Sequence, residues 1–241
     1  PSQYAGVMLR RALAADHGLL NVRFMILPRL AEYLGSPALA KDGKAPLTPL
    51  VELAAIGHIA TEVGADGPLR AVSHHPGLPR LLRRTFGEFS RLEETDLSNL
   101  ADVDGLRAQL VDWYRLFREE TKGYYVHEGL VRAAEDAVSN GLVADTLRDI
   151  GYVVFYLVND LTKAEARLIK SLIDTDQAAM VLGMVGEAEI DEDTLLMKTA
   201  VFGGTALTGE GFEIPPPVRL LSAPDSREEI RWIVRDIARR C

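Results

Sequence analysis

One stretch, Gly151–Val185, constrains the fold more than any other part of the chain. It opens with Tyr152–Val158, an apolar run whose Val, Tyr and Phe content is typical of a buried parallel strand. Thr162 and Glu165 follow at the spacing of a capping box and predict the first turn of a helix. Ala178–Val185 then has the composition of a second buried strand. The stretch therefore predicts two parallel strands joined by a right-handed helical crossover.

The first of these strands is expected to be buried on both faces. Because side chains alternate along a strand, Val153, Phe155 and Leu157 should share one face, and Val154 and Tyr156 the other. Burying both sets requires helices on both sides of the sheet. The N-terminal helix and the helix that begins near Thr162 are the expected covers.

Composition sets the broad class. The chain has 241 residues, 47% apolar and 26% charged, which is ordinary for a globular protein. No apolar run approaches the roughly 20 residues that cross a bilayer, and no signal peptide opens the chain, so we expect no membrane partner. The one cysteine, Cys241, permits no internal disulfide and fits a reducing, cytoplasmic compartment. A net charge of −8 disfavours wholesale nucleic-acid binding but allows a local basic face.

The N-terminal segment is expected to add a strand to the same sheet. Ser2–His17 has helical spacing, Asn21–Leu27 has strand composition, and a short helix should begin at Pro28 and end at Gly35. We expect the strand at Asn21–Leu27 to lie parallel to the other two strands. The chain begins at Pro1 without a Met, so we expect a piece of a longer protein.

The block between Gly35 and Gly151 is expected to be all helical. It contains no convincing strand and four helical patterns, at Pro49–Gly64, Pro76–Glu94, Asp102–Thr121 and His127–Ser139. A further helix is expected at Asp191–Phe202, and a strand with a capped helix follows Pro215-Pro216-Pro217. The predicted domains are an α/β domain (1–35 and 151–214), a helical insertion (36–150) and the start of a second α/β domain (215–241).

This order of parts resembles a known family. LRRAL (9–13) with NVRFMILPRLAEYLG (21–35), Tyr152–Ile173, MVLGMVGE (180–187) and VRLLSAPDSREEIRWIVRDIARR (218–240) carry the resemblance. Together they resemble the first motor domain of UvrD/Rep-type superfamily 1 helicases, in particular the degenerate AddB-like subunits of helicase–nucleases. The resemblance implies an incomplete RecA-like, P-loop-NTPase-like parallel sheet with an inserted helical subdomain. It also implies DNA repair or recombination, with single-stranded DNA or duplex ends and a helicase–nuclease subunit as partners.

Departures from the family pattern argue against catalysis. A phosphate-binding loop ends in Gly-Lys-Ser/Thr, but the one Gly-Lys here, Gly43-Lys44, is followed by Ala45. Asp160 is the lone acid after the central strand, and Glu187 replaces the sensor Asp, so both are expected to be vestiges of a nucleotide and metal site. Asp160 can also be a simple turn residue. We expect no catalytic residue, metal or cofactor in this chain, although ATP and Mg²⁺ are compatible with a longer protein.

Four arginines form the densest basic patch and are the candidate DNA contacts: Arg80, Arg83, Arg84 and Arg91. The alternative is a solvated helix face whose arginines pair with Glu88, Glu93 and Glu94. The aromatic residues Trp113, Tyr114, Tyr124 and Tyr125 offer either base stacking or core packing.

Two other patterns are expected to be structural. His74-His75 lacks further ligands at zinc-like spacing, and Glu120-Thr121-Lys122 matches only half of a nuclease motif. The sequence thus predicts DNA binding or scaffolding within a helicase–nuclease, without ATP hydrolysis. The alternatives are an active ATP-dependent helicase whose phosphate-binding loop lies upstream, and a non-catalytic protein-interaction module.

Overall fold

The computed structural model describes residues 6–7, 9–11, 13–14, 21–62, 67–158, 161–183 and 188–203. The chain divides into two compact units, Pro1–Thr205 and Ala206–Cys241, and all described residues belong to the first. The predicted start of a second α/β domain at 215–241 therefore lies outside the described residues. The described part is mainly helical and contains two small parallel sheets of two strands each, so an α/β mixture is present.

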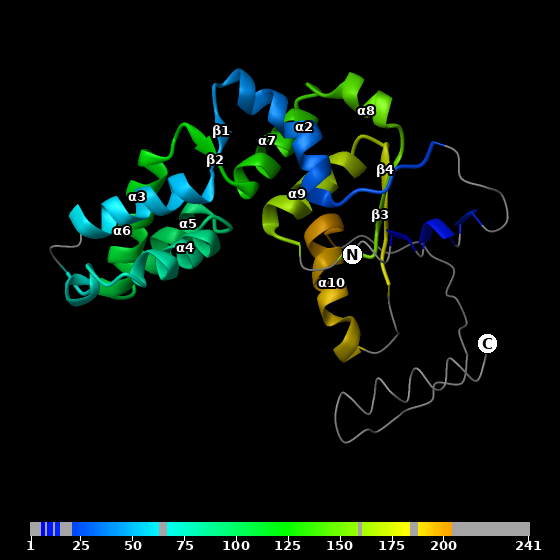
Figure 1. The fold of residues 1–241 in the computed structure, drawn as a ribbon. Coiled ribbons are helices and arrows are strands. Elements are labelled where there is room, and N and C mark those ends of the chain that lie inside the picture. Colours follow the sequence, from blue (N-terminus) through cyan, green and yellow to red (C-terminus); the bar gives the residue numbers. More distant parts are fainter. Residues whose placement is uncertain are drawn as a thin grey trace, which may run out of the picture. The chain divides into compact units, whose positions relative to one another are not determined.

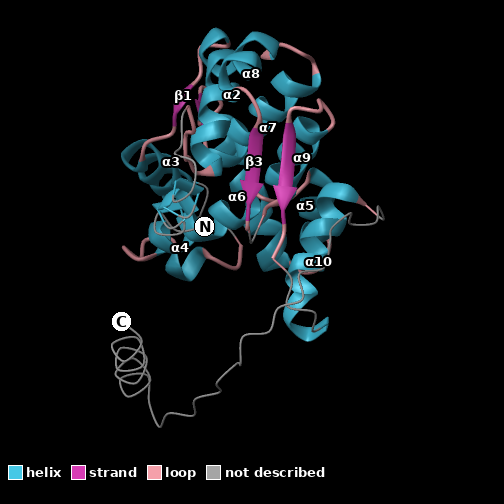
Figure 2. Ribbon diagram, turned by 90° about the vertical axis from the view of Figure 1, so that its right-hand side faces the viewer, coloured by secondary structure: helices cyan, strands magenta, loops and turns pink. Residues whose placement is uncertain are grey.

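The predicted strand–helix–strand unit is confirmed. Strands β3 (Val153–Tyr156) and β4 (Ala178–Val181) pair in parallel, and α9 (Lys163–Ile173) connects them. Among the described residues both strands are shorter than the predicted Tyr152–Val158 and Ala178–Val185. The capping box is present as expected, because the Thr162 hydroxyl accepts from the Glu165 N–H at 3.3 Å and the Glu165 carboxylate accepts from the Thr162 N–H at 2.9 Å. The two strands lie side by side in Figure 2.

The expectation that the central strand, β3, is buried on both faces is wrong. Phe155 is buried and Val153 half-buried, whereas Val154 is 56% exposed. Within the described residues, the helices that pack with Phe155 in one hydrophobic cluster cover only one face of this small sheet. The outer face turns toward the viewer in Figure 2, with α7 and α9 behind it. Tyr156, on the same face as Val154, is half-buried, so the described residues cover this outer face only in part.

The prediction of a strand at Asn21–Leu27 is also wrong. Residues 21–26 are exposed and pair with no described strand, and Leu27 is the first residue of helix α2 (Leu27–Lys41). Three parallel strands in one sheet are therefore not found in the described part of the chain. The helix does not end at Gly35 but runs on through Pro37, which lies inside it. Strand composition alone does not form a strand, because a strand needs a neighbour to accept its hydrogen bonds.

The described residues build two separate hydrophobic clusters, which define two lobes (Figure 1). The first lobe contains β3, β4, α2, α9 and the helices α7 (His127–Ser139), α8 (Ala144–Ile150) and α10 (Ala188–Phe202). The second lobe contains α3 (Pro49–Glu62), α4 (Leu78–Phe89), α5 (Glu94–Ala101) and α6 (Gly105–Glu120). Its centre is aromatic: the Phe86 ring lies 5.5 Å from that of Tyr114 and 5.2 Å from that of Phe117. A short 3₁₀ helix, Arg70–Val72, precedes α4.

The helical patterns of the central block are largely confirmed, and α7 has the predicted bounds. The expectation that the block has no strand is wrong, because β1 (Ala45–Pro46) pairs in parallel with β2 (Tyr124–Tyr125). The two chain crossings between the lobes run side by side there, with Ala45 N–H donating to Gly123 O at 3.1 Å. The predicted domain boundaries stay a prediction, although α7, from inside the block, packs in the first lobe.

None of the helices in the described part of the chain is long and apolar enough to cross a membrane.

Candidate nucleic-acid interface

Helix α4 separates an apolar face from a basic one. Leu78, Leu82 and Phe86 are buried in the second lobe. At about 100° per residue, Arg80 and Arg84 point to the opposite side of the helix, one turn apart. Both are exposed, so the amphipathic pattern that buries one face presents guanidinium groups on the other.

The structure places all four predicted arginines on exposed positions, but two of them are paired. Arg83 Nε lies 2.7 Å from Glu52 Oε2 of α3. Arg91, in the turn after α4, lies 3.4 Å from Glu88 Oε2. Arg80 and Arg84 make no ion pair with any described residue. These two guanidinium groups are therefore available to an anionic partner without first breaking an internal contact.

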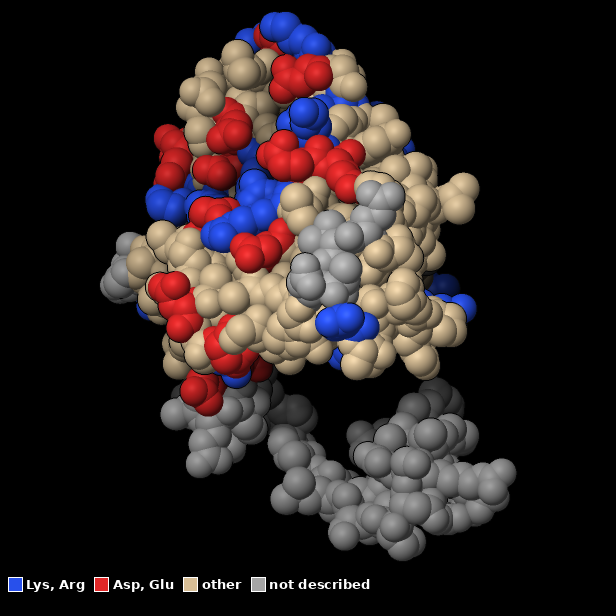
Figure 3. Space-filling model, turned by 90° about the vertical axis from the view of Figure 1, so that its left-hand side faces the viewer, with Lys and Arg blue, Asp and Glu red and all other residues tan. Residues whose placement is uncertain are grey.

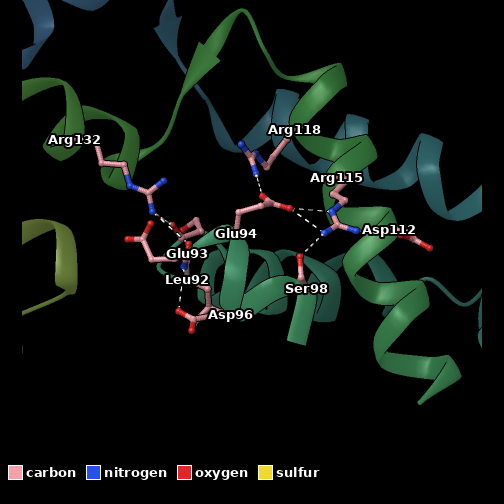
Figure 4. Close-up of polar contacts among 10 residues, drawn as sticks. Leu92, Glu93, Glu94, Asp96, Ser98, Asp112, Arg115, Arg118 and Arg132 are labelled. Carbon is pink, nitrogen blue, oxygen red and sulfur yellow. Dashed lines mark hydrogen bonds and ion pairs between the residues drawn. The ribbon is translucent and has the colours of Figure 1, made fainter. Parts of the chain in front are cut away.

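In the alternative interpretation, the four arginines pair with Glu88, Glu93 and Glu94. Among the described residues, only Glu88 of these three acids pairs with one of the four arginines, Arg91. Glu93 pairs with Arg167 at 2.9 Å, and Glu94 pairs with Arg115 at 2.9 Å and Arg118 at 3.0 Å, as Figure 4 shows for Glu94. The acids that follow α4 in the sequence thus neutralise cations of other helices. The sequence could not indicate this, because Arg115, Arg118 and Arg167 are 21 to 74 residues away from their partners.

Gly87 continues the basic side of α4. It is exposed in the helix interior, where glycine costs about 1 kcal/mol relative to alanine. A Cβ built at Gly87 would meet nothing within 4 Å, so packing does not require a glycine. Because Gly87 has no side chain, a ligand can approach the backbone of α4 closely beside Arg83 and Arg84.

Elsewhere the second lobe mixes charges of both signs. Figure 3 shows acidic and basic side chains interspersed over this side of the molecule. The Arg115 and Arg118 guanidinium groups share the Glu94 carboxylate and lower its pKa, chiefly through the hydrogen bond from Arg115. Paired cations of this kind attract an external polyanion weakly, since their charge is already balanced nearby.

A polar group links α7 with the start of α9. His127 Nε2 lies 3.2 Å from Glu165 Oε1, and this hydrogen bond raises the pKa of His127 and lowers that of Glu165. Glu128 is buried beside them, and desolvation raises its pKa. The Thr162 hydroxyl lies 3.4 Å from Glu128 Oε2. Sequence reasoning found Thr162 and Glu165 as a helix cap but missed the histidine partner.

The other candidates are structural or lie outside the described residues. Trp113 and Tyr114 are buried in the second lobe, so core packing is confirmed and base stacking is wrong for both. Tyr124 is exposed and Tyr125 half-buried at the β1–β2 pair. His75 Nδ1 accepts the Gly77 N–H at 3.0 Å, which is a turn contact.

Asp160 and Glu187, the expected vestiges of a nucleotide site, lie outside the described residues. No three His, Cys, Asp or Glu side chains gather as metal ligands in the parts of the chain that the structure describes. No protein-family model, curated protein or solved structure matches this chain.

Proposed function

We propose that this chain is a helicase-like DNA repair or recombination protein that contributes DNA binding within a helicase–nuclease and does not hydrolyse ATP itself. The observation that carries the proposal is the basic side of α4, where Arg80 and Arg84 are exposed, one turn apart and without an ion pair among the described residues. Arginine on a helix surface is well suited to phosphate, because its planar guanidinium donates two parallel hydrogen bonds.

The geometry of α4 fits the repeat of a nucleic-acid backbone. Four residues of helix rise by roughly 6 Å, so Arg80 and Arg84 are far enough apart to contact two separate phosphates of one strand. Contacts to phosphate carry no base sequence, so binding should be independent of sequence. With a net charge of −8, the protein must bind through this local surface, and affinity should fall steeply with salt.

The helicase-like part of the proposal draws support from the first lobe. The parallel strands β3 and β4, joined by the capped helix α9, are the kind of unit from which P-loop-NTPase-like sheets are built. The missing Gly-Lys-Ser/Thr loop in the sequence supports a binding role rather than a catalytic one.

The test is a salt series of affinity for a fluorescein-labelled oligo-dT measured by anisotropy. Replacing both free arginines, Arg80→Gln and Arg84→Gln, should weaken binding. Each phosphate contact contributes about 0.7 to the slope of log affinity against log salt for a single strand, so the slope should fall by roughly 1.4. Arg148→Gln is the matched control, because Arg148 is 74% exposed but lies on α8 in the first lobe.

An unchanged slope in the double variant, or an equal loss in the Arg148 control, would refute the role of α4. Repeating the titration with a duplex of the same length determines whether the surface prefers single strands.

A second candidate function is a protein-interaction module, favoured by the exposed apolar side chains on the outer face of the β3–β4 sheet. Tyr152, Val154 and Val181 are 64%, 56% and 42% exposed there, and apolar side chains of adjacent strands are commonly covered by a partner. The same titration separates the two functions, because a module that binds only protein gives no salt-dependent affinity for DNA.

A further inference from the structure

The two lobes do not share a hydrophobic core. Within the described residues, every buried apolar side chain except Met197 of α10 belongs to one cluster or the other. Lobes of this kind are free to change their relative orientation unless other contacts fix it. Among the described residues, three sets of polar contacts connect them: a backbone pair, two ion pairs, and two hydrogen bonds from one arginine side chain.

The backbone connection is the β1–β2 pair. The chain passes from the first lobe to the second between α2 and α3 and returns between α6 and α7. Both crossings are short and lie against each other, with Leu47 N–H donating to Tyr125 O at 2.9 Å. Gly43 precedes β1 with a φ of 71°, and a Cβ at Gly123 would meet nothing within 4 Å. The glycines beside the two paired crossings give the backbone the conformational freedom that a hinge needs.

The charged connection joins the first turns of α5 and α9. Lys163 Nζ lies 3.0 Å from Asp96 Oδ2, and Arg167 lies 2.9 Å from Glu93 Oε1. The side chains of these four residues are 37% to 63% exposed. We name these two ion pairs the clasp. Half-exposed ion pairs are weak individually and are screened by salt, so the clasp can open without unfolding either lobe.

Opening the clasp leaves both helices capped. Glu93 and Asp96 form the capping box of α5, and the Glu93 N–H donates to Asp96 Oδ2 at 3.3 Å. Thr162 and Glu165 cap α9 independently of the other lobe. The acids of the clasp therefore keep a local role when their basic partners leave. This arrangement allows two alternative states of the same folded lobes.

A third contact across the lobes is weaker. Arg132 of α7 donates to Leu92 O at 3.3 Å (Figure 4) and to Ser90 O at 3.4 Å, and both distances are at the long end of the hydrogen-bond range. Its Nε is buried and has no hydrogen-bond partner among the described residues. A buried donor left unpaired offsets part of what the two long hydrogen bonds of Arg132 contribute to the closed arrangement.

We propose that the second lobe swings on the β1–β2 hinge, and that the clasp holds it closed at low ionic strength and releases it as salt rises. The screening length falls from roughly 30 Å at 0.01 M salt to about 3 Å at 1 M, so attraction across the clasp weakens over this range. The two hydrophobic clusters do not depend on attraction between charges, so each lobe stays folded as the salt concentration rises. This salt-dependent opening does not depend on DNA binding by α4.

Distances between spin labels on the two lobes test the proposal in the full chain. Ala54 on α3 and Asp149 on α8 are exposed, one on each lobe, and both are replaced by cysteine after Cys241→Ser removes the native thiol. We expect one narrow distance distribution at 0.01 M salt and a longer, broader one at 1 M. The clasp residues are unchanged in this first measurement, so misfolding of a clasp variant cannot affect its outcome.

Clasp variants give the second arm of the test. Lys163→Gln with Arg167→Gln should show the broad distribution already at 0.01 M salt. The matched control is Lys170→Gln, since Lys170 lies on the same helix but pairs with Asp174 of its own lobe at 2.8 Å. Distances that ignore salt in the wild type, or a double variant that behaves as the Lys170 control does, would overturn the proposal.

Discussion

Close packing of α2 against α7 gives the sharpest prediction, the replacement Gly35→Ala. Gly35 lies in the interior of α2, where the helix crosses α7. A Cβ at this position would lie 2.5 Å from Leu130 O and 2.8 Å from Ala134 N. Both obstacles are backbone atoms of α7, so no change of side-chain rotamer relieves the clash. The two helices must instead move apart.

The cost follows from that separation. Restoring ordinary contact requires a shift of roughly 1 Å, and a gap of about 0.5–1 Å forfeits a quarter to a half of the dispersion energy across an interface. Overpacking of this kind costs about 1–3 kcal/mol, and the better helix propensity of alanine returns up to about 1 kcal/mol. We expect Gly35→Ala to lower the free energy of unfolding by about 1–2 kcal/mol.

Gly87→Ala is the matched control, because it makes the same chemical change inside a helix where a Cβ meets nothing within 4 Å. It should stabilise the protein by about 0.5–1 kcal/mol. Urea denaturation followed by circular dichroism measures both changes as opposite shifts of the midpoint. If Gly35→Ala stabilises the protein as Gly87→Ala does, the close crossing of α2 and α7 is refuted.

Three further predictions concern the core, pH and nucleotide. Phe155→Ala should destabilise the protein by about 3–5 kcal/mol in the same urea assay, and a change below about 1 kcal/mol would contradict its burial. The hydrogen bond with Glu165 raises the pKa of His127 in the folded protein. The pair therefore stabilises the fold fully below pH 6.5, and this stabilisation is lost as pH rises through the higher pKa of the folded state. Its size is less than about 1 kcal/mol. His127→Gln should flatten that alkaline loss, and an identical pH profile would exclude the pair as its source. A coupled-enzyme assay should detect no ATP hydrolysis with or without DNA, and Mg²⁺-dependent turnover abolished by Asp160→Ala would contradict the non-catalytic proposal.

Local patterns of the sequence determined the elements whose signals are complete within a few residues. The capping box at Thr162 and Glu165 and the bounds of α7 are confirmed, and the apolar run Tyr152–Val158 contains the shorter strand β3. The exposure of the α4 arginines follows in the same way from helical periodicity. In each case the backbone and its nearest neighbours in sequence supply the stabilising contacts.

Tertiary structure decided everything that depends on a distant neighbour. Asn21–Leu27 has strand composition but no strand beside it among the described residues, and Gly35 looks like a helix end but provides room for α7. Val154 was expected to be buried, yet the described helices cover only the other face of its sheet. Strand pairing, helix crossings and ion pairs such as Glu93–Arg167 each need two segments brought together from far apart in the chain. Which segments meet is decided by how the hydrophobic clusters pack, and periodicity within one segment does not contain that information.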